Sequence, residues 1–157
     1  MKPSFLINST EFKKLKKLQR RYPEIFRKAM EQAGIQFMNW ANNGSAKEAR
    51  KPPIRWGVLR GSASVFVADK LVAVTTEGND GTPALSYSGN PLVITWAWNT
   101  KYAAKMHEHQ GNWGSATERD GDAGNKWLER HLDKDKDDLM KMIAETVNKS
   151  VGKGGNR

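Results

Sequence analysis

The stretch Lys51–Thr76, KPPIRWGVLRGSASVFVADKLVAVTT, is where the sequence changes from helical to strand periodicity. Its two prolines cannot continue a helix, and the glycine that follows them permits a bend before a short helical turn at 58–60. Runs rich in β-branched and apolar residues come next at 64–68 and 71–76, separated only by Asp69-Lys70. Two such runs at this spacing predict a β-hairpin.

Two helices are predicted on the N-terminal side of the hairpin. Apolar residues recur at helical spacing between 12 and 18 while Lys and Arg fill the other side, which predicts a basic amphipathic helix. Pro23 ends or kinks it, and a second run from Phe26 to Ala41 repeats an apolar residue every three or four positions, as a core helix does. Gly34 inside this run costs about 1 kcal/mol relative to Ala, and marks either a close approach by another element or a soft point.

The strongest strand of the sequence is Leu92–Asn99, LVITWAWN. Its alternation places two aliphatic side chains and two tryptophans on one face, which we expect to pack on the second helix rather than to form a ligand shelf. Residues 101–111 then favour a short helix or an irregular strand end. A final helix opens near 124–125, and its charged run Asp133–Asp138 is either an exposed middle or a break between two shorter helices.

Together these segments predict an α+β fold, in which N-terminal helices pack on a small, mainly antiparallel β-sheet with a C-terminal helix. A length of 157 residues suits one domain, which we place at 1–149. Polar and glycine-rich composition predicts flexible loops at about 42–53, 77–90 and 111–124, and a flexible tail at 150–157. We expect the 42–53 loop to be an arm that orders only against a partner.

Composition narrows the function. There is no Cys, so neither a disulfide framework nor a thiolate metal site is expected, and no apolar run approaches the length of a membrane span. We therefore expect a soluble, unsecreted protein with no membrane partner. The net charge of +9 is uneven, because residues 1–60 carry 14 Lys and Arg against 4 Asp and Glu, whereas residues 61–157 are nearly balanced. Such asymmetry suits nucleic acid or a contact between unlike subunit faces.

The sequence contains no nucleophile elbow, phosphate loop or dinucleotide fingerprint, so no catalytic residue and no enzymatic activity is expected. His107-Glu108-His109 resembles a fragment of a metal site without a second group of ligands, and we interpret it as a polar, exposed turn. Asp120-Gly121-Asp122 lacks the spacing of a calcium loop. We predict no metal and no cofactor.

Two short motifs suggest a family. Gly57, Leu59 and Ser62 form a Gly-x-Leu-x-x-Ser segment that precedes the first strand, with Arg60 as a basic residue inside it. Further along, a Tyr-Ala pair is followed by an acidic residue and a glycine. That second motif comprises Tyr102, Ala103, Glu108 and Gly111.

With Trp127-Leu128 on the final helix, this order of elements over about residues 22–147 resembles the head–tail joining proteins of tailed bacteriophages, also called neck, tail-completion or minor capsid proteins. The resemblance implies a structural virion protein without catalytic residues. It implies a ring homo-oligomer, generally a hexamer, between the portal-associated connector protein and the tail terminator or tail tube protein. Its location would be the virion neck, and the host cytoplasm during assembly.

Within this hypothesis, loop cations and a loop aromatic are the expected contacts between subunits or with partners. They are Lys47, Arg50, Lys51, Arg55 and Trp113. Reversing the charges of Arg50, Lys51 and Arg55 together should then impair assembly and leave the fold intact.

The alternative function is a basic nucleic-acid-binding module that uses the helix from Lys13 to Arg21 and the Lys47–Arg60 region. A charged outer face is also what an ordinary solvated helix shows. In the ring hypothesis, non-specific contact with DNA in the channel is compatible with the same basic residues.

Overall fold

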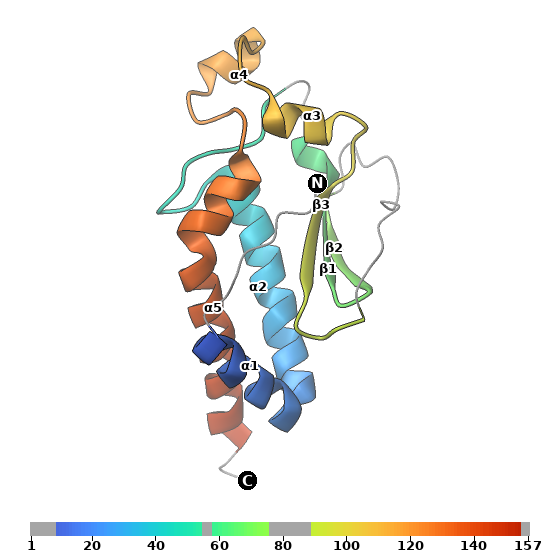
Figure 1. The fold of residues 1–157 in the computed structure, drawn as a ribbon, viewed down its shortest axis with the longest axis vertical. Coiled ribbons are helices and arrows are strands. Elements are labelled where there is room, and N and C mark those ends of the chain that lie inside the picture. The colour runs from blue at the N-terminus through green and yellow to red at the C-terminus, as the bar shows by residue number, and fades with distance from the viewer. Residues whose placement is uncertain (1–8, 55–57, 76–88, 155–157) are drawn as a thin grey trace.

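The computed structural model describes residues 9–54, 58–75 and 89–154. Its helices and strands follow one another as the periodicity predicts, and the helices pack on a small antiparallel sheet with a long helix at the C-terminal end. The predicted α+β fold is therefore confirmed. Figure 1 shows α2 lying between the final helix, α5, and the sheet.

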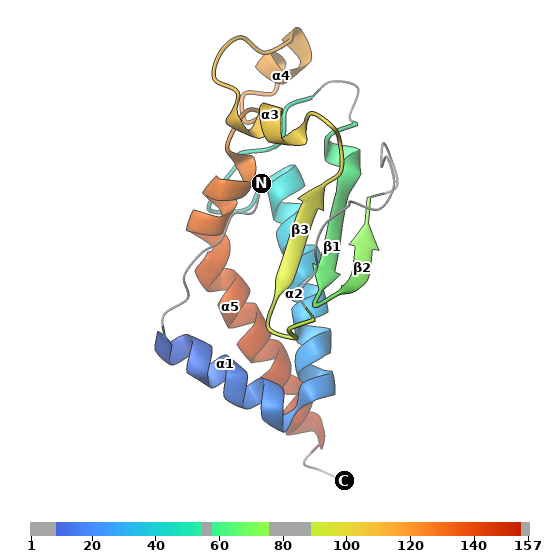
Figure 2. The same ribbon diagram turned by 45° about the vertical axis from the view of Figure 1, so that its right-hand side comes forward.

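The N-terminal helices are α1, Ser9–Arg21, and α2, Pro23–Asn43. Pro23 occupies the first turn of α2, where its missing N–H leaves no hydrogen bond unmade, so it divides the two helices as expected. Gly44 then ends α2 with φ of 88°, and its N–H donates to the carbonyl oxygen of Trp40 at 2.7 Å. In Figure 2, α1 crosses α2 and α5 at one end of the molecule.

The sheet has the strand order β2-β1-β3, with both pairs antiparallel. Its strands are β1, Ala63–Val67, β2, Lys70–Val74, and β3, Ile94–Trp98, and the 3₁₀ turn Arg60–Ser62 leads into β1. The hairpin is confirmed, but Val67 pairs with Lys70, so the turn is Ala68-Asp69, one residue earlier than expected. Ala68 takes the left-handed φ of 55° that this tight turn needs.

Gly34 of α2 is the point of closest approach between helix and sheet. A Cβ atom there would lie 2.8 Å from Cγ1 of Val65 and 3.2 Å from Cγ2 of Ile94, so of the two explanations for this glycine the close approach holds. The indole Nε1 of Trp96 donates to the Gly34 carbonyl oxygen at 2.8 Å, and its ring contacts Phe37 with centroids 4.4 Å apart. The apolar face of β3 thus packs on α2 as predicted.

The final helix, α5, runs unbroken from Trp127 to Gly154. The charged run Asp133–Asp138 therefore lies within one helix. Within the run Asp135 is buried, and the other residues are exposed or partly exposed. Leu132, Leu139 and Ile143 join α2 side chains in the largest apolar cluster. The helix passes residue 150, where we had placed a flexible tail.

The remaining helices are α3, Ala103–Glu108, and α4, Ser115–Arg119. We expected either a short helix or an irregular strand end at 101–111, and α3 is a short helix. The second, α4, lies within the 111–124 segment, for which we had predicted only a loop. The predicted 77–90 loop falls almost wholly outside the described residues.

Candidate functional site

Among the predicted contact residues, Lys47 and Arg50 lie on the segment between α2 and the sheet but have different surroundings. The Lys47 Nζ lies 2.8 Å from Oδ1 of Asp138, and the two side chains are 48% and 44% exposed. The hydrogen bond to Asp138 raises the pKa of Lys47. An exposed ion pair of this kind contributes little to stability, so Lys47 remains available to a partner.

Arg50 is held within the chain. Its Nε donates to the carbonyl oxygen of Asn125 and its Nη2 to the side-chain oxygen of Asn125, both at 2.9 Å. The guanidinium lies over Gly124, where a Cβ atom would be 2.6 Å from Nη2. Burial, with the charge of Arg130, lowers the pKa of Arg50. This side chain fastens the 44–54 segment to the start of α5.

Lys51 and Arg60 converge on Asp120. Nη2 of Arg60 lies 3.0 Å from Oδ2 of Asp120, and Nζ of Lys51 lies 3.4 Å from Oδ1. The hydrogen bond from Arg60, followed by that from Lys51, lowers the pKa of Asp120. Lys51 also pairs its backbone with Ala123 in a parallel bridge. The acidic residues near α4 thus neutralise cations of the same chain.

These contacts correct two expectations. The 44–54 segment lies against α5 and the residues around α4 rather than forming an arm that needs a partner for order. Charge reversal at Arg50 and Lys51 would break contacts inside the chain, so we expect such a variant to lose stability as well as any contact with a partner. Arg55 lies outside the described residues.

A polar cluster that was not predicted from the sequence comprises the buried His131 and Asp135 and the half-buried Ser45. His131 Nδ1 lies 2.5 Å from Oδ2 of Asp135, and His131 Nε2 donates to the carbonyl oxygen of Arg50 at 2.7 Å. Ser45 Oγ donates to the other Asp135 oxygen at 2.8 Å. The spacing of four residues between His131 and Asp135 was visible as a helical pair.

This cluster contains the three residue types of a hydrolase triad in a different order. The aspartate lies between the serine and the histidine, so the imidazole does not contact the serine oxygen that it would have to activate. His131 and Asp135 are closed to solvent. The cluster therefore has a structural role, in which its hydrogen bonds link the 44–54 segment to α5.

Trp113, the remaining predicted contact residue, contacts a histidine of the His107-Glu108-His109 motif. Trp113 is half-buried, with its ring edge-to-face on His109 at a centroid distance of 4.7 Å. His107 is 1% exposed and packs on Trp127 with centroids 4.8 Å apart, so the exposed turn that we predicted is wrong for this residue. Within the described residues, no group of His, Asp and Glu side chains could hold a metal ion.

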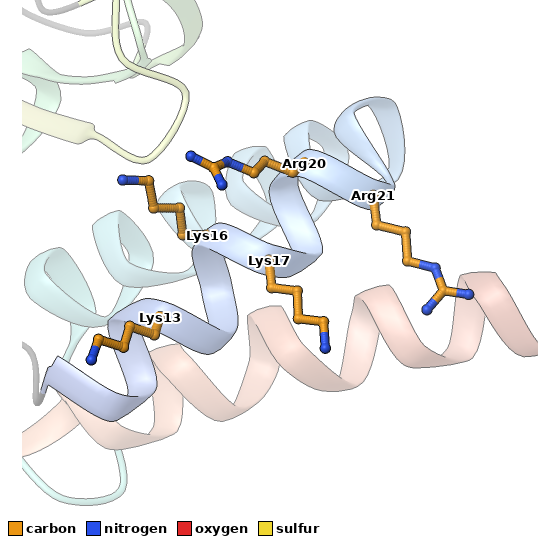
Figure 3. A pocket seen from close by; sticks show the side chains of 5 residues that line it. All are labelled: Lys13, Lys16, Lys17, Arg20 and Arg21. Atoms are coloured by element: carbon orange, nitrogen blue, oxygen red, sulfur yellow. The ribbon is translucent and has the colours of Figure 1, made fainter.

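The other charged surface is the basic face of α1, defined here as its six basic residues, and all six are exposed. Five of them line a shallow hollow of about 450 Å³ (Figure 3). Among the described residues, no carboxylate lies within ion-pair distance of any of the six, which are Lys13, Lys14, Lys16, Lys17, Arg20 and Arg21.

Comparison of the chain with protein-family models, curated proteins and solved structures finds no match. In the described ranges, no helix combines the length and the apolar character that a membrane span needs.

Proposed function

We propose that this protein is a structural virion protein of the bacteriophage neck, which forms a ring between the head connector and the tail. The observation that carries the proposal is that Leu59 and Ser62 of the first motif lie beside the segment that leads into Tyr102, where the second motif begins. Ser62 Oγ donates to the Leu59 carbonyl oxygen at 2.8 Å, which closes the turn before β1. The Asn99 N–H donates to the Ser62 carbonyl oxygen at 2.9 Å, which joins that turn to the segment leading into Tyr102 and α3.

The motif residues therefore have a structural part in this fold. Leu59 and Ser62 are buried beside the start of β1, and Tyr102 precedes α3, where its carbonyl oxygen accepts from the Met106 N–H at 2.9 Å. A short polar residue suits position 62 because its hydroxyl satisfies a buried carbonyl oxygen. This arrangement supports the resemblance to head–tail joining proteins, since it gives Leu59, Ser62 and Tyr102 structural positions that do not involve catalysis.

The sheet offers a surface for ring contacts. Within the described residues β1 is central, so β2 and β3 each pair with one strand only. On β2, Leu71 and Val74 are 44% and 45% exposed. An open strand edge that bears exposed aliphatic side chains is suited to pairing with another chain. A head-to-tail contact between unlike surfaces closes a ring when its rotation permits.

The test is the mass of the protein in solution, measured by light scattering, alone and mixed with candidate connector and tail proteins. A species several times the 17.6 kDa of the subunit, alone or only with a partner, is the expected result. A persistent monomer in every mixture would overturn the proposal.

A matched pair of variants locates the contact. Leu71→Lys combined with Val74→Lys should prevent the large species, because two charges would be buried at the strand edge. Phe12→Lys replaces another exposed apolar residue, 40% exposed on α1, and should leave assembly unchanged. Circular dichroism confirms that each variant is folded. Equal assembly by both would remove β2 from the interface.

A further inference from the structure

We propose that the basic face of α1 binds the phosphate backbone of double-stranded DNA without reading its sequence. This inference is independent of the ring, because a single folded chain presents the surface. The alternative function predicted from the sequence was a nucleic-acid-binding module that uses both α1 and the Lys47–Arg60 region. The present proposal assigns the DNA contacts to α1 alone.

The ion pairs of the chain are distributed unevenly between its two basic regions. In the second basic region, Lys47, Lys51 and Arg60 each have a carboxylate partner within the chain, and Arg50 is bound to Asn125. The basic face of α1 has no such partner among the described residues. In the described part of the chain its positive charge is therefore uncompensated, whereas Lys47, Lys51 and Arg60 are each paired with Asp138 or Asp120.

The exposed side of α5 has the mixed charges of an ordinary solvated helix. There, exposed Lys134 and Lys141 alternate with Asp133 and Asp137 and form weak pairs with neighbouring acids. In α1, six basic residues accompany a single acid, Glu11. Like charges four residues apart, such as Lys13 and Lys17, repel each other, and an external polyanion relieves that repulsion.

The basic side chains of α1 are arranged in two rows. Lys13, Lys17 and Arg21 extend to one side of α1, and Lys16 and Arg20 to the other (Figure 3). Side chains four residues apart are separated by about 6 Å along a helix axis, and a DNA strand carries one phosphate for about each 3.4 Å of duplex axis. Along a strand parallel to the helix, successive side chains of one row would therefore meet about every second phosphate.

The apolar side of α1 distinguishes DNA from other anionic partners. Leu15 is buried in the main apolar cluster and Leu18 packs against it, so the side that a membrane-bound helix would insert is already used inside the protein. Phe12 is the single large apolar residue of α1 that is exposed. Protein interfaces need apolar anchors near their centre, whereas phosphate binding needs charge alone.

The test measures binding of a fluorescent duplex of about 30 base pairs as a function of salt. Four phosphate contacts predict a log–log slope near −3.6, which is about a 150-fold loss of affinity between 50 and 200 mM salt. The variant Lys13→Gln/Lys16→Gln/Lys17→Gln/Arg20→Gln should lose most of that slope. Glutamine preserves helix propensity, so circular dichroism should not change.

The matched control removes the same charge from α5. It is Arg130→Gln/Lys134→Gln/Lys136→Gln/Lys141→Gln, and we expect it to keep the wild-type slope. Equal losses in both variants would show that net charge alone is responsible and would overturn the proposal. So would failure of the wild type to bind the duplex. Preferential binding to polyglutamate or to vesicles of anionic lipid would also overturn it, in favour of an acidic protein or a membrane.

Discussion

The imidazole of His131 and the carboxylate of Asp135 lie 2.5 Å apart within α5, and both are closed to solvent. Through these two side chains α5 holds Ser45 and the backbone of Arg50. The charged segment after α2 is therefore held by this polar cluster as well as by the contacts of Arg50 and Lys51. The stability of this segment should depend on groups that no solvent reaches.

Asp135→Ala tests that cluster. The substitution leaves His131 Nδ1 and Ser45 Oγ without their shared acceptor, and buried polar groups that lose a partner cost about 1–3 kcal/mol each. We expect the free energy of unfolding, measured by urea denaturation, to fall by about 3 kcal/mol. Asp137→Ala, at an exposed position two residues later, should change it by less than about 0.5 kcal/mol. Similar effects of the two substitutions would contradict the fastening role.

Arg50 and Lys47 were predicted as equivalent contact residues, and the structure separates them. Arg50→Ala removes two hydrogen bonds to Asn125, so the free energy of unfolding should fall by about 1–3 kcal/mol. Lys47→Ala breaks an exposed pair with Asp138 and should change it by about 0.5 kcal/mol or less. Thermal or urea unfolding of the two variants measures this difference in stability. If Lys47→Glu then reduces assembly without loss of stability, Lys47 belongs to an interface.

Gly34→Ala should destabilise the contact between α2 and the sheet. The added methyl group would meet Cγ1 of Val65 at 2.8 Å, and overpacking of this kind costs about 1–3 kcal/mol. Adding Val65→Ala should recover part of the loss by making room. Gly152→Ala, where a Cβ meets nothing within 4 Å, should instead stabilise α5 by up to about 1 kcal/mol. A neutral Gly34→Ala would show that helix and sheet are not in close contact.

His107 should make stability depend on pH. Burial, opposed by the hydrogen bond with Glu108, holds its pKa below the ordinary value of 6.5, while Lys126 and Glu129 face it from the start of α5. As the pH falls below that value, the unfolded chain takes up a proton that the folded protein does not. The free energy of unfolding therefore decreases with acidification, from about pH 6.5 down to the lowered pKa.

Urea denaturation at about pH 7.5 and 5.5 measures this effect. His107→Gln should flatten the difference, by at most about 1.4 kcal/mol per pH unit, since a single proton is involved. His109→Gln, on the neighbouring histidine that packs on Trp113, should keep the wild-type dependence. An unchanged slope in His107→Gln would rule out this residue as the origin.

Local signals were enough for most of the architecture. Pro23 divides two helices because it lacks an N–H, and the alternation of β3 follows from the two-residue repeat of a strand. Gly34 was recognisable as an anomaly inside a helix, and its explanation needed only a neighbouring element. The turn moved by one residue because the hairpin register depends on backbone geometry at Ala68, which composition does not reveal.

The polar contacts were not predictable in the same way. Asp135 lies in a run of charges that indicates exposure, and His107 lies in a motif that indicates a polar turn. Both are buried because a segment distant in sequence covers them: the residues after α2 in one case and Trp127 in the other. Charge, periodicity and turn residues by themselves determined that the chain is basic at its N-terminal end and folds as helices on an antiparallel sheet. Which cations are neutralised within the chain, and which stay exposed on α1, was decided by the tertiary structure, because an ion pair forms only where folding brings a carboxylate within a few ångströms of a cation.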